Sequence, residues 1–365
     1  MTWDILDANF TVATMIRGGS QYATDIPKAV PTELVFSPGQ PSVLFAEENG
    51  VPFRGQEDAK HLMRIYIDAL GPDDRIKALL TGPAGTGKTT LAWILAARIQ
   101  DHRTRQGLPT GRFFEVLPAQ IASKAELDQF MRELKPYDIV FVDEIHILRQ
   151  NVGAEPLYHT LDDTGEPRYP LGNGQGWLDI PANVSWIGAT TEPGELDGTT
   201  GGALRRRLSP EVRLEAPSID TLVEILYDQS MPVADDYTAR QMACRSGGLP
   251  WQVLNIYNTA EKVAKSKQRA IIDWTVANTT FQILGVDEYG LFGMDRDVIR
   301  TLLESPYKMR TGEVRYKMAE TALCSAAGID RHTYKEIVQP RLMRLGFLTT
   351  VGGQSLTTKA VELFS

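Results

Sequence analysis

The sequence predicts an α/β fold with a parallel sheet, followed by a helical lid domain and a C-terminal winged helix. Three observations predict this organisation. An apolar run at 76–80 leads into a glycine-rich loop, and a good helix at 91–99 follows that loop. A second apolar run at 137–142 ends in two carboxylates, as a strand buried on both faces of a parallel sheet would. From residue 218 the pattern becomes helical, and the chain closes with short helices and a hairpin.

The composition is that of an ordinary globular chain, with 42% hydrophobic and 23% charged residues among 365. The formal net charge of −8 excludes a global basic footprint for nucleic acid, so DNA contact requires a local patch. Cys244 and Cys324 lie far apart without a C-x-x-C spacing, which argues against structural zinc and fits a reducing cytosol. We find no signal-peptide pattern and no bilayer-spanning stretch, and therefore expect a cytoplasmic protein without membrane contact.

The length suggests two or three domains, and changes in pattern indicate their boundaries. We expect an N-terminal extension at 1–50, a large α/β domain at 51–217, a helical lid at 218–290 and a winged helix at 291–365. Glycines and prolines interrupt the extension, where 32–36 is the one short strand that we expect. The extension is either a partner-binding arm or a packed addition to the large domain, and the sequence favours the packed addition.

The glycine-rich loop has the P-loop pattern G-x-x-x-x-G-K-[ST]. Its glycines let backbone N–H groups curl around a triphosphate, and the following helix N-terminus adds partial positive charge. In this pattern the lysine reaches the β- and γ-phosphates, and the next hydroxyl binds Mg²⁺. A glycine-rich turn before an ordinary helix is the alternative, which the strand–loop–helix context disfavours. The predicted ATP- or ADP-binding residues are Gly82, Pro83, Ala84, Gly85, Thr86, Gly87, Lys88, Thr89 and Thr90.

The second apolar run ends in Asp143 and Glu144, the Walker B form. The carboxyl end of a parallel strand faces the crevice where ligands bind. There Asp143 can hold Mg²⁺ through water, beside the Thr89 hydroxyl, and Glu144 can polarise the attacking water. An acidic turn after a strand is common and would be the better interpretation alone. The P-loop upstream makes nucleotide hydrolysis the better interpretation here.

Two further segments carry candidate residues. A strand predicted at 183–191 ends in small hydroxyl residues that can sense the γ-phosphate or position water, and turn residues at 162–177 predict a projecting hairpin or loop. A later helical segment ends in Arg205, Arg206 and Arg207. One arginine delivered into a neighbouring subunit's site would stabilise charge on the γ-phosphate. On spacing alone, a solvated basic turn is the better interpretation of these arginines.

The last part of the chain is helical and locally basic. Ten basic and six acidic side chains at 296–346 give 10 − 6 = +4, which indicates either a DNA-facing surface or an ordinary solvated face. Gly346 precedes a predicted hairpin whose turn contains Gly352 and Gly353. The helical segments that we predict are 219–230, 237–246, 251–266, 273–284, 294–303, 316–327 and 330–345.

Together these motifs resemble the RuvB family, AAA+ motors that drive branch migration of Holliday junctions. The likeness covers residue 51 to the end of the chain. It includes a C-terminal stretch at 337–348 that is similar to the family's winged-helix pattern. The other motifs that carry it are GPAGTGKTTLA at 82–92, VDEIH at 142–146, IGATT at 187–191, and 204–208 followed by 212–215.

The resemblance implies an AAA+ P-loop ATPase domain, a lid and a winged helix, assembled as a homo-hexameric ring on duplex or branched DNA. It implies ATP or ADP with Mg²⁺ as cofactors and a RuvA-like junction-binding protein as a partner. By position, Thr191 resembles sensor 1, Arg205 the arginine finger and Arg207 a second basic position. The other positions that match the family's nucleotide pocket are Phe53, Arg54 and Pro250.

Three departures from the family pattern predict a divergent relative with altered use of DNA. Trp251 follows Pro250 where the family has its sensor 2 arginine, and an indole cannot offer a cationic fork to phosphate. The predicted wing at 349–355 carries no arginine, although phosphate contacts dominate DNA affinity. This wing should therefore bind DNA weakly or not at all. The first fifty residues also exceed the family's usual short arm.

Three functions stay open from the sequence. The leading one is an ATP-driven translocase that acts on branched DNA as a ring. The second is a clamp-loader-like or helicase-loading switch, although clamp loaders end in a helical collar rather than a winged helix. The third is a nucleotide-binding ring scaffold without translocation, which Trp251 and the arginine-free wing suggest. Glu144 argues against the scaffold, because only hydrolysis needs this carboxylate.

Overall fold

The computed structural model describes residues 32–34, 53–117, 121–153, 155–162, 167–196, 201–308, 314–350 and 353–365. The chain divides into two compact units, Met1–Ala216 and Pro217–Ser365. The predicted extension at 1–50 lies outside the described residues except for one strand, and so does Gly352 of the predicted wing turn. Among the described helices, none is long and apolar enough to cross a lipid bilayer.

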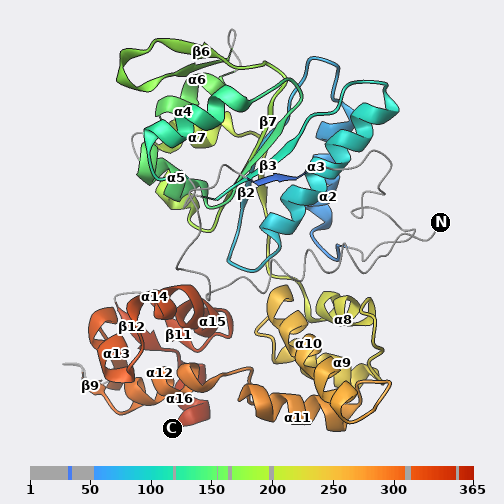
Figure 1. Cartoon of the computed structure of the whole chain (residues 1–365). Coiled ribbons are helices and arrows are strands. Elements are labelled where there is room, and N and C mark those ends of the chain that lie inside the picture. The colour runs from blue at the N-terminus through green and yellow to red at the C-terminus, as the bar shows by residue number, and fades with distance from the viewer. Residues whose placement is uncertain are drawn as a thin grey trace. The chain divides into compact units, whose positions relative to one another are not determined.

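A six-stranded sheet forms the centre of the first unit (Figure 1). Five strands are parallel, as predicted, and the strand from the N-terminal segment pairs antiparallel at one edge. In spatial order the strands are β1 (Thr32–Leu34), β3 (Phe113–Val116), β4 (Ile139–Val142), β7 (Ser185–Thr190), β2 (Lys77–Thr81) and β8 (Glu211–Arg213).

The three central strands explain where the functional residues gather. Every residue of β2, β4 and β7 is buried, as expected for strands that helices cover on both faces. Because these strands are parallel, their carboxyl ends meet at one edge of the sheet. At this edge β2 continues into the glycine-rich loop, β4 into Asp143 and Glu144, and β7 into Thr191.

Two layers of helices cover the sheet and form two hydrophobic cores, one on each face. The helices of one layer are α2 (Glu57–Asp68) and α3 (Lys88–Arg105). The helices of the other layer are α4 (Lys124–Glu133), α5 (Ile145–Val152), α6 (Glu155–Leu161) and α7 (Gly201–Arg207).

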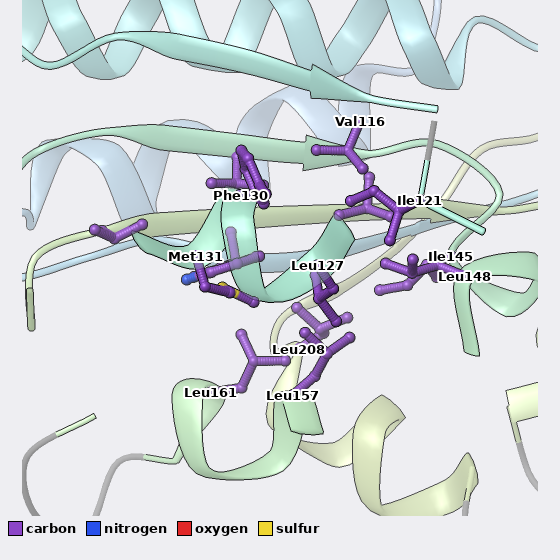
Figure 2. Close-up of a cluster of buried hydrophobic side chains, with 14 of the residues drawn as sticks. Val116, Ile121, Leu127, Phe130, Met131, Ile145, Leu148, Leu157, Leu161 and Leu208 are labelled. Atoms are coloured by element: carbon purple, nitrogen blue, oxygen red, sulfur yellow. The ribbon is translucent and has the colours of Figure 1, made fainter. Parts of the chain in front are cut away.

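Figure 2 shows part of the core under the second layer. Leu127 and Phe130 come from α4, Ile145 from α5, and Leu157 and Leu161 from α6, and all five are at most 2% exposed. Full burial of such side chains contributes about 1.5–3 kcal/mol each to folding. This core holds α5, which begins directly after the two Walker B carboxylates, against the sheet.

The hairpin predicted within 162–177 is formed, although residues 163–166 of that segment lie outside the described part. Its root is fixed to α4, because Lys124 Nζ donates hydrogen bonds to Asp128 Oδ1 and the Tyr169 hydroxyl, each at 2.7 Å. The Tyr169 hydroxyl donates to Asp128 Oδ1 at 2.7 Å. Trp177 on the second strand is 54% exposed. The strands are β5 (Arg168–Pro170) and β6 (Trp177–Asp179).

Four helices with their own hydrophobic core open the second unit, where the helical lid is predicted. Three of them begin at a side chain that accepts a hydrogen bond from a backbone N–H three residues on, namely Ser218, Asp235 and Asp273. Such N-caps stabilise a helix by about 1 kcal/mol each. The helices are α8 (Ile219–Tyr227), α9 (Asp236–Cys244), α10 (Pro250–Ser266) and α11 (Trp274–Leu284).

A separate core joins the C-terminal elements. The prediction of a helix from residue 316 is wrong, because 314–318 form a strand and the helix begins only at Glu320. The winged-helix assignment stays a prediction, which the helices before an antiparallel β11–β12 pair support. The elements are α12 (Gly293–Leu303), β9 (Pro306–Lys308), β10 (Val314–Met318), α13 (Glu320–Ala327), α14 (Arg331–Thr333), η4 (Tyr334–Val338), α15 (Gln339–Arg344), β11 (Leu348–Thr349), β12 (Gln354–Leu356) and α16 (Thr358–Phe364).

Candidate nucleotide-hydrolysis site

The glycine-rich loop has a backbone shape that two of its glycines make possible. Gly82 has a φ of 145° and Gly87 a φ of 98°, values that favour glycine. A Cβ atom on Gly82 would lie 2.3 Å from the carbonyl oxygen of Leu214, and one on Gly87 would lie 3.0 Å from the Phe53 ring. The loop therefore fits between the end of β8 and Phe53, and α3 begins directly after it with N–H groups suited to an anion.

Lys88 is the first residue of α3, and its side chain is held inside the loop. It is 6% exposed, and its Nζ donates to the carbonyl oxygens of Gly82 at 2.9 Å and Pro83 at 3.0 Å. Burial lowers the pKa of Lys88, and the nearby carboxylates of Glu144 and Asp143 oppose that change. An ammonium group bonded to loop carbonyls in this way can exchange them for the oxygens of a bound phosphate.

The predicted magnesium ligands lie together. The Thr89 hydroxyl donates to Asp143 Oδ2 at 3.2 Å, and the backbone N–H of Glu144 donates to Asp143 Oδ1 at 3.0 Å. Burial, and then the charge of Glu144, raise the pKa of Asp143. A hydroxyl and a carboxylate fit Mg²⁺, which binds few protein oxygens and shares its other positions with phosphates and water. Within the described residues, no group of three or more His, Cys, Asp and Glu side chains could hold a metal ion by itself. A metal at this site therefore needs phosphate and water as further ligands.

Glu144 and Thr191 contact each other directly, so the structure brings the predicted water-activating group to the predicted sensor. Glu144 Oε2 accepts hydrogen bonds from the Thr191 backbone N–H at 2.9 Å and from its hydroxyl at 3.0 Å. His146 Nδ1 lies 3.3 Å from the same oxygen. Glu144 has a φ of 43°, which is uncommon for a residue other than glycine and turns the chain sharply after β4. Two donor groups of Thr191 thus bind one carboxylate oxygen, and the His146 ring lies beside it.

His146 and Thr190 lie inside the motifs at 142–146 and 187–191, but the sequence interpretation gave neither residue a role of its own. His146 is 7% exposed, and its Nδ1 lies 3.0 Å from the Thr190 hydroxyl oxygen. The Thr190 hydroxyl oxygen accepts a hydrogen bond from the backbone N–H of Glu192 at 3.0 Å. Residues two apart on a regular helix do not face each other. The backbone turn at Glu144 is what brings His146 to its carboxylate, and no sequence pattern shows that turn.

Glu115 is a second carboxylate that the sequence interpretation did not assign. It lies on β3, where it pairs with Phe141 of the Walker B strand. Burial, and then the negative charge of Asp143, raise the pKa of Glu115 to about 7. A carboxyl group that titrates near neutral pH therefore lies within electrostatic range of the predicted metal ligand.

The segment before α2 lies beside the glycine-rich loop. Phe53 packs partly buried against the core of α2 and α3 and lies next to Gly87 of the loop. Arg54 follows it, partly buried. Gln56, which was not predicted, donates from Nε2 to the carbonyl oxygen of Glu215 at 2.6 Å and accepts from its N–H at 3.2 Å. These two bonds tie the segment to the chain after β8, while adenine binding by Phe53 and Arg54 stays a prediction.

The two predicted arginines of α7 bind carboxylates of their own chain. Arg205 donates from Nε to Glu211 Oε2 at 2.8 Å and from Nη2 to Oε1 at 2.9 Å. Arg207 donates from Nη2 to Asp162 Oδ2 at 3.2 Å, and its guanidinium lies 4.9 Å from the centre of the Tyr158 ring. The arginines are therefore more than a solvated basic turn. Their action on a neighbour's nucleotide stays a prediction.

The basic surplus of the C-terminal domain does not form one free surface. Arg341 is 6% exposed and donates to Asp295 Oδ2 at 2.8 Å. Arg344 on the same helix donates to the carbonyl oxygen of Gly247, before α10, at 3.2 Å. Neither a DNA-facing surface nor a solvated face describes these two arginines, which join the C-terminal helix to elements within the second unit.

Pro250 is the first residue of α10 in the second unit, and Trp251 follows it. A proline suits this position because the first helical residue needs no N–H partner. The predicted contribution of Pro250 to the nucleotide site stays a prediction.

Residues 48–214 match the family model described as the Holliday junction DNA helicase RuvB P-loop domain. The Holliday junction branch migration complex subunit RuvB of Lactobacillus gasseri is 30% identical over 315 residues, which cover 84% of this chain and 86% of that protein. The subunit of the same name from Synechocystis sp. is 30% identical over 348 residues, covering 92% of this chain and 90% of that protein. The similarity thus extends far beyond the P-loop domain.

Solved structures give the same result. The Thermotoga maritima RuvB Holliday junction branch migration motor has a TM-score of 0.68 at 25% identity, covering 85% of this chain and 95% of that chain. The Aeropyrum pernix ORC2 protein, solved in ADPNP–ADP complexes, has a TM-score of 0.53 at 14% identity, which shows a shared fold alone. With the assembled site and relatives that match most of its length, the chain belongs to the RuvB family of AAA+ proteins.

Proposed function

We propose that this chain is the ATP-hydrolysing motor subunit of a ring that moves branched DNA, as branch migration of a Holliday junction requires. One observation carries the proposal. Lys88, the Thr89–Asp143 pair and the Glu144–Thr191 pair meet at the ends of β2, β4 and β7. The chain is also similar, over most of its length, to proteins named as branch migration complex subunits.

When bound, ATP with Mg²⁺ supplies the bond whose hydrolysis releases the energy for movement. Lys88 exchanges its two carbonyl partners for phosphate oxygens, and the first N–H groups of α3 support the same negative charge. Thr89 and Asp143 would hold the metal. Glu144 orients the attacking water and accepts its proton. Because Thr191 donates two hydrogen bonds to Oε2 of Glu144, we assign the water to Oε1.

The assembly is part of the proposal. An arginine that acts on a neighbour's γ-phosphate needs a closed ring in which every subunit both gives and receives one. We propose a homo-hexamer with Arg205 in this role and Arg207 beside it, and a RuvA-like junction-binding protein as the partner that recruits the ring to branched DNA. We also propose a cytoplasmic location, which suits the two free cysteines, Cys244 and Cys324.

A helicase-loading switch is the second candidate, and the C-terminal domain favours it. Arg341 and Arg344 bind groups of their own chain, and the predicted wing at 349–355 carries no arginine. A domain with few available phosphate contacts would bind another protein more readily than DNA. In that case the ATP cycle would place a partner protein, and a pulldown would recover a helicase or clamp without any movement of DNA.

The test is a branch-migration assay on a synthetic four-way junction of labelled strands, with ATP and with a RuvA-like protein from the same source. The wild-type protein should convert the junction into two duplexes, and junction DNA should stimulate its ATPase more than linear duplex does. The variant Glu144→Gln should retain nucleotide binding and move no junction. The proposal would be overturned by an ATPase indifferent to both DNAs together with an unchanged junction.

A further inference from the structure

Arg205 is held on its own subunit in the geometry that it would need for a phosphate. Nε and Nη2 of Arg205 donate side by side to the two carboxylate oxygens of Glu211, at 2.8 and 2.9 Å. A planar guanidinium recognises carboxylates and phosphates with the same two-pronged edge. One edge cannot bind Glu211 and a neighbour's γ-phosphate at the same time. The two acceptors therefore compete for Arg205.

Glu211 is itself fixed to the strand that leads into its own P-loop. It is the first residue of β8 and pairs with Leu79 of β2. Its Oε1 accepts a hydrogen bond from the Thr81 hydroxyl at 3.3 Å. Thr81 is 2% exposed and directly precedes Gly82. The carboxylate that holds Arg205 is thus oriented by a buried residue rather than free to follow the arginine.

The Arg205–Glu211 pair is exposed enough to exchange partners. The Arg205 side chain is 31% exposed and the Glu211 side chain 34%. Ion pairs at such positions are weakened by solvent and screened by salt. A triphosphate offers more negative charge than one carboxylate, so it can displace Glu211 when a neighbouring subunit brings it close.

We propose that Glu211 is a positioning residue that retains Arg205 on its own subunit until the γ-phosphate of a neighbour's ATP displaces it. This inference rests on the proposed function, because it takes Arg205 to act on the neighbouring subunit. The pair raises the subunit concentration at which hydrolysis begins. It leaves the rate of the assembled ring nearly unchanged, since Glu211 does not touch the reacting atoms.

The test measures ATPase rate against subunit concentration without DNA, for the wild type and Glu211→Gln. The glutamine keeps the size of the side chain and removes its charge. The concentration for half-maximal activity should fall by about threefold or more, while the rate at saturating concentration stays within about twofold, because an exposed pair contributes modestly. The shift should shrink at high salt, which weakens the pair in the wild type too.

Three controls separate this effect from a structural one. Glu215→Gln changes an exposed carboxylate on the same segment, 4.0 Å from Arg213 Nε, and should leave both values unchanged. Combining Arg205→Ala with Glu211→Gln should abolish the gain, because no arginine is left to release. If Glu211→Gln lowers the melting temperature, Glu211→Asp is used, and a smaller shift in the same direction is expected. An unchanged or raised half-maximal concentration in the folded variant overturns the proposal.

Arg205→Ala alone distinguishes the inference from the function on which it rests. If it lowers the ATPase rate at least about tenfold and Glu211→Gln causes no shift, the retention by Glu211 is wrong and the shared site stands. If Arg205→Ala changes nothing at any concentration, the shared site itself is wrong. The wild type could also fail to move a junction while Glu211→Gln still lowers the concentration for half-maximal activity. This result would contradict only the DNA part of the proposed function.

Discussion

Single residues around Glu144 set how its carboxylate is oriented, and His146 is the one most open to test. We predict that His146→Gln lowers kcat by about tenfold with little change in ATP affinity, because orienting groups behind a reactive residue have effects of this size. The loss should come from a misdirected Glu144 rather than from weaker binding. Steady-state ATPase kinetics and binding of a fluorescent ATP analogue measure the two quantities.

His159→Asn provides a matched control for that experiment. His159 is exposed and contacts Trp177 of the hairpin, away from Glu144. Its substitution should leave kcat and the ATP affinity unchanged. A His146→Gln variant with normal kcat, or one that loses ATP affinity and kcat equally, would contradict the orienting role.

The carboxyl group of Glu115 should make the stability of the folded protein depend on pH. Burial raises its pKa from the ordinary 4.5 to about 7, so the folded protein binds a proton that the unfolded chain has already released. The stabilisation from this proton is complete below pH 4.5 and is lost as the pH rises through 7. Glu115→Gln should therefore have a higher melting temperature than the wild type at pH 8, with a smaller difference at pH 5.5. Thermal unfolding without nucleotide measures it.

The exposed carboxylate Glu362 gives the control for this titration. Glu362→Gln should change the melting temperature by a similar small amount at both pH values. The role of Glu115 would be contradicted if Glu115→Gln differed from the wild type equally at pH 5.5 and pH 8.

At the residue scale, local patterns predicted the parts of the site that contiguous residues build. In the P-loop and Walker B motifs, the spacing of the residues is enough to predict how their side chains are placed. These motifs contain Lys88, Thr89, Asp143 and Glu144. His146 could not be assigned in this way, because its position depends on the positive φ of Glu144, which no residue pattern announces. The partner of Arg205 was equally hidden, since it depends on the fold of the turn between α7 and β8.

At the scale of elements, a buried ion pair joins α12 to α15. Arg341 and Asp295 are 7% and 0% exposed at the side chain, and their charged groups lie 2.8 Å apart. We predict that Arg341→Met destabilises the C-terminal domain by about 3–5 kcal/mol, because it leaves a buried carboxylate without its partner. Replacing both residues, as Asp295→Leu with Arg341→Met, should recover much of this loss.

Cys324 offers a local readout of that prediction, because it is buried in the C-terminal core whereas Cys244 is exposed. In a Cys244→Ser background, thiol labelling of Cys324 under native conditions reports opening of this domain. Arg341→Met should accelerate labelling by about a hundredfold or more, the equivalent of 3 kcal/mol. Equal labelling rates for the single and the double variant would contradict the ion-pair argument.

Elements with a strong period were the ones that sequence could predict. Strand β4 is continuously apolar, and three of the four lid helices carry caps that mark their starts. Strand β10 was mistaken for the start of a helix, because three of its five residues were grouped with the apolar helix that follows. Its alternating apolar and basic side chains at 314–318 have the two-residue period of a strand.

At the scale of the whole molecule, sequence could count charges but could not show which of them face solvent. The surplus of +4 at 296–346 includes Arg341 and Arg344, and both bind groups of the second unit. Charge reaches a partner only from an exposed side chain, so the surplus overstates the attraction of this domain for DNA.

The proposed ring requires that each active site takes residues from two subunits, and this can be tested by mixing variants. Lys88→Ala removes phosphate binding within a subunit, and Arg205→Ala removes the arginine offered to the neighbour. Neither variant should hydrolyse ATP at a useful rate alone. When the two are mixed equally, about one quarter of the interfaces combine an intact Lys88 with an intact Arg205, so about a quarter of the wild-type rate should return.

The ratio of the two variants makes this measurement decisive. The recovered rate should be greatest in the equal mixture and fall toward either pure variant, because active interfaces depend on the product of the two fractions. Mixing Lys88→Ala with Glu144→Gln gives a matched control: both variants lack a residue of the same subunit's site, so no interface regains a complete set. Recovery in the control, or none at any ratio of the test pair, would show that hydrolysis does not depend on a site shared between subunits.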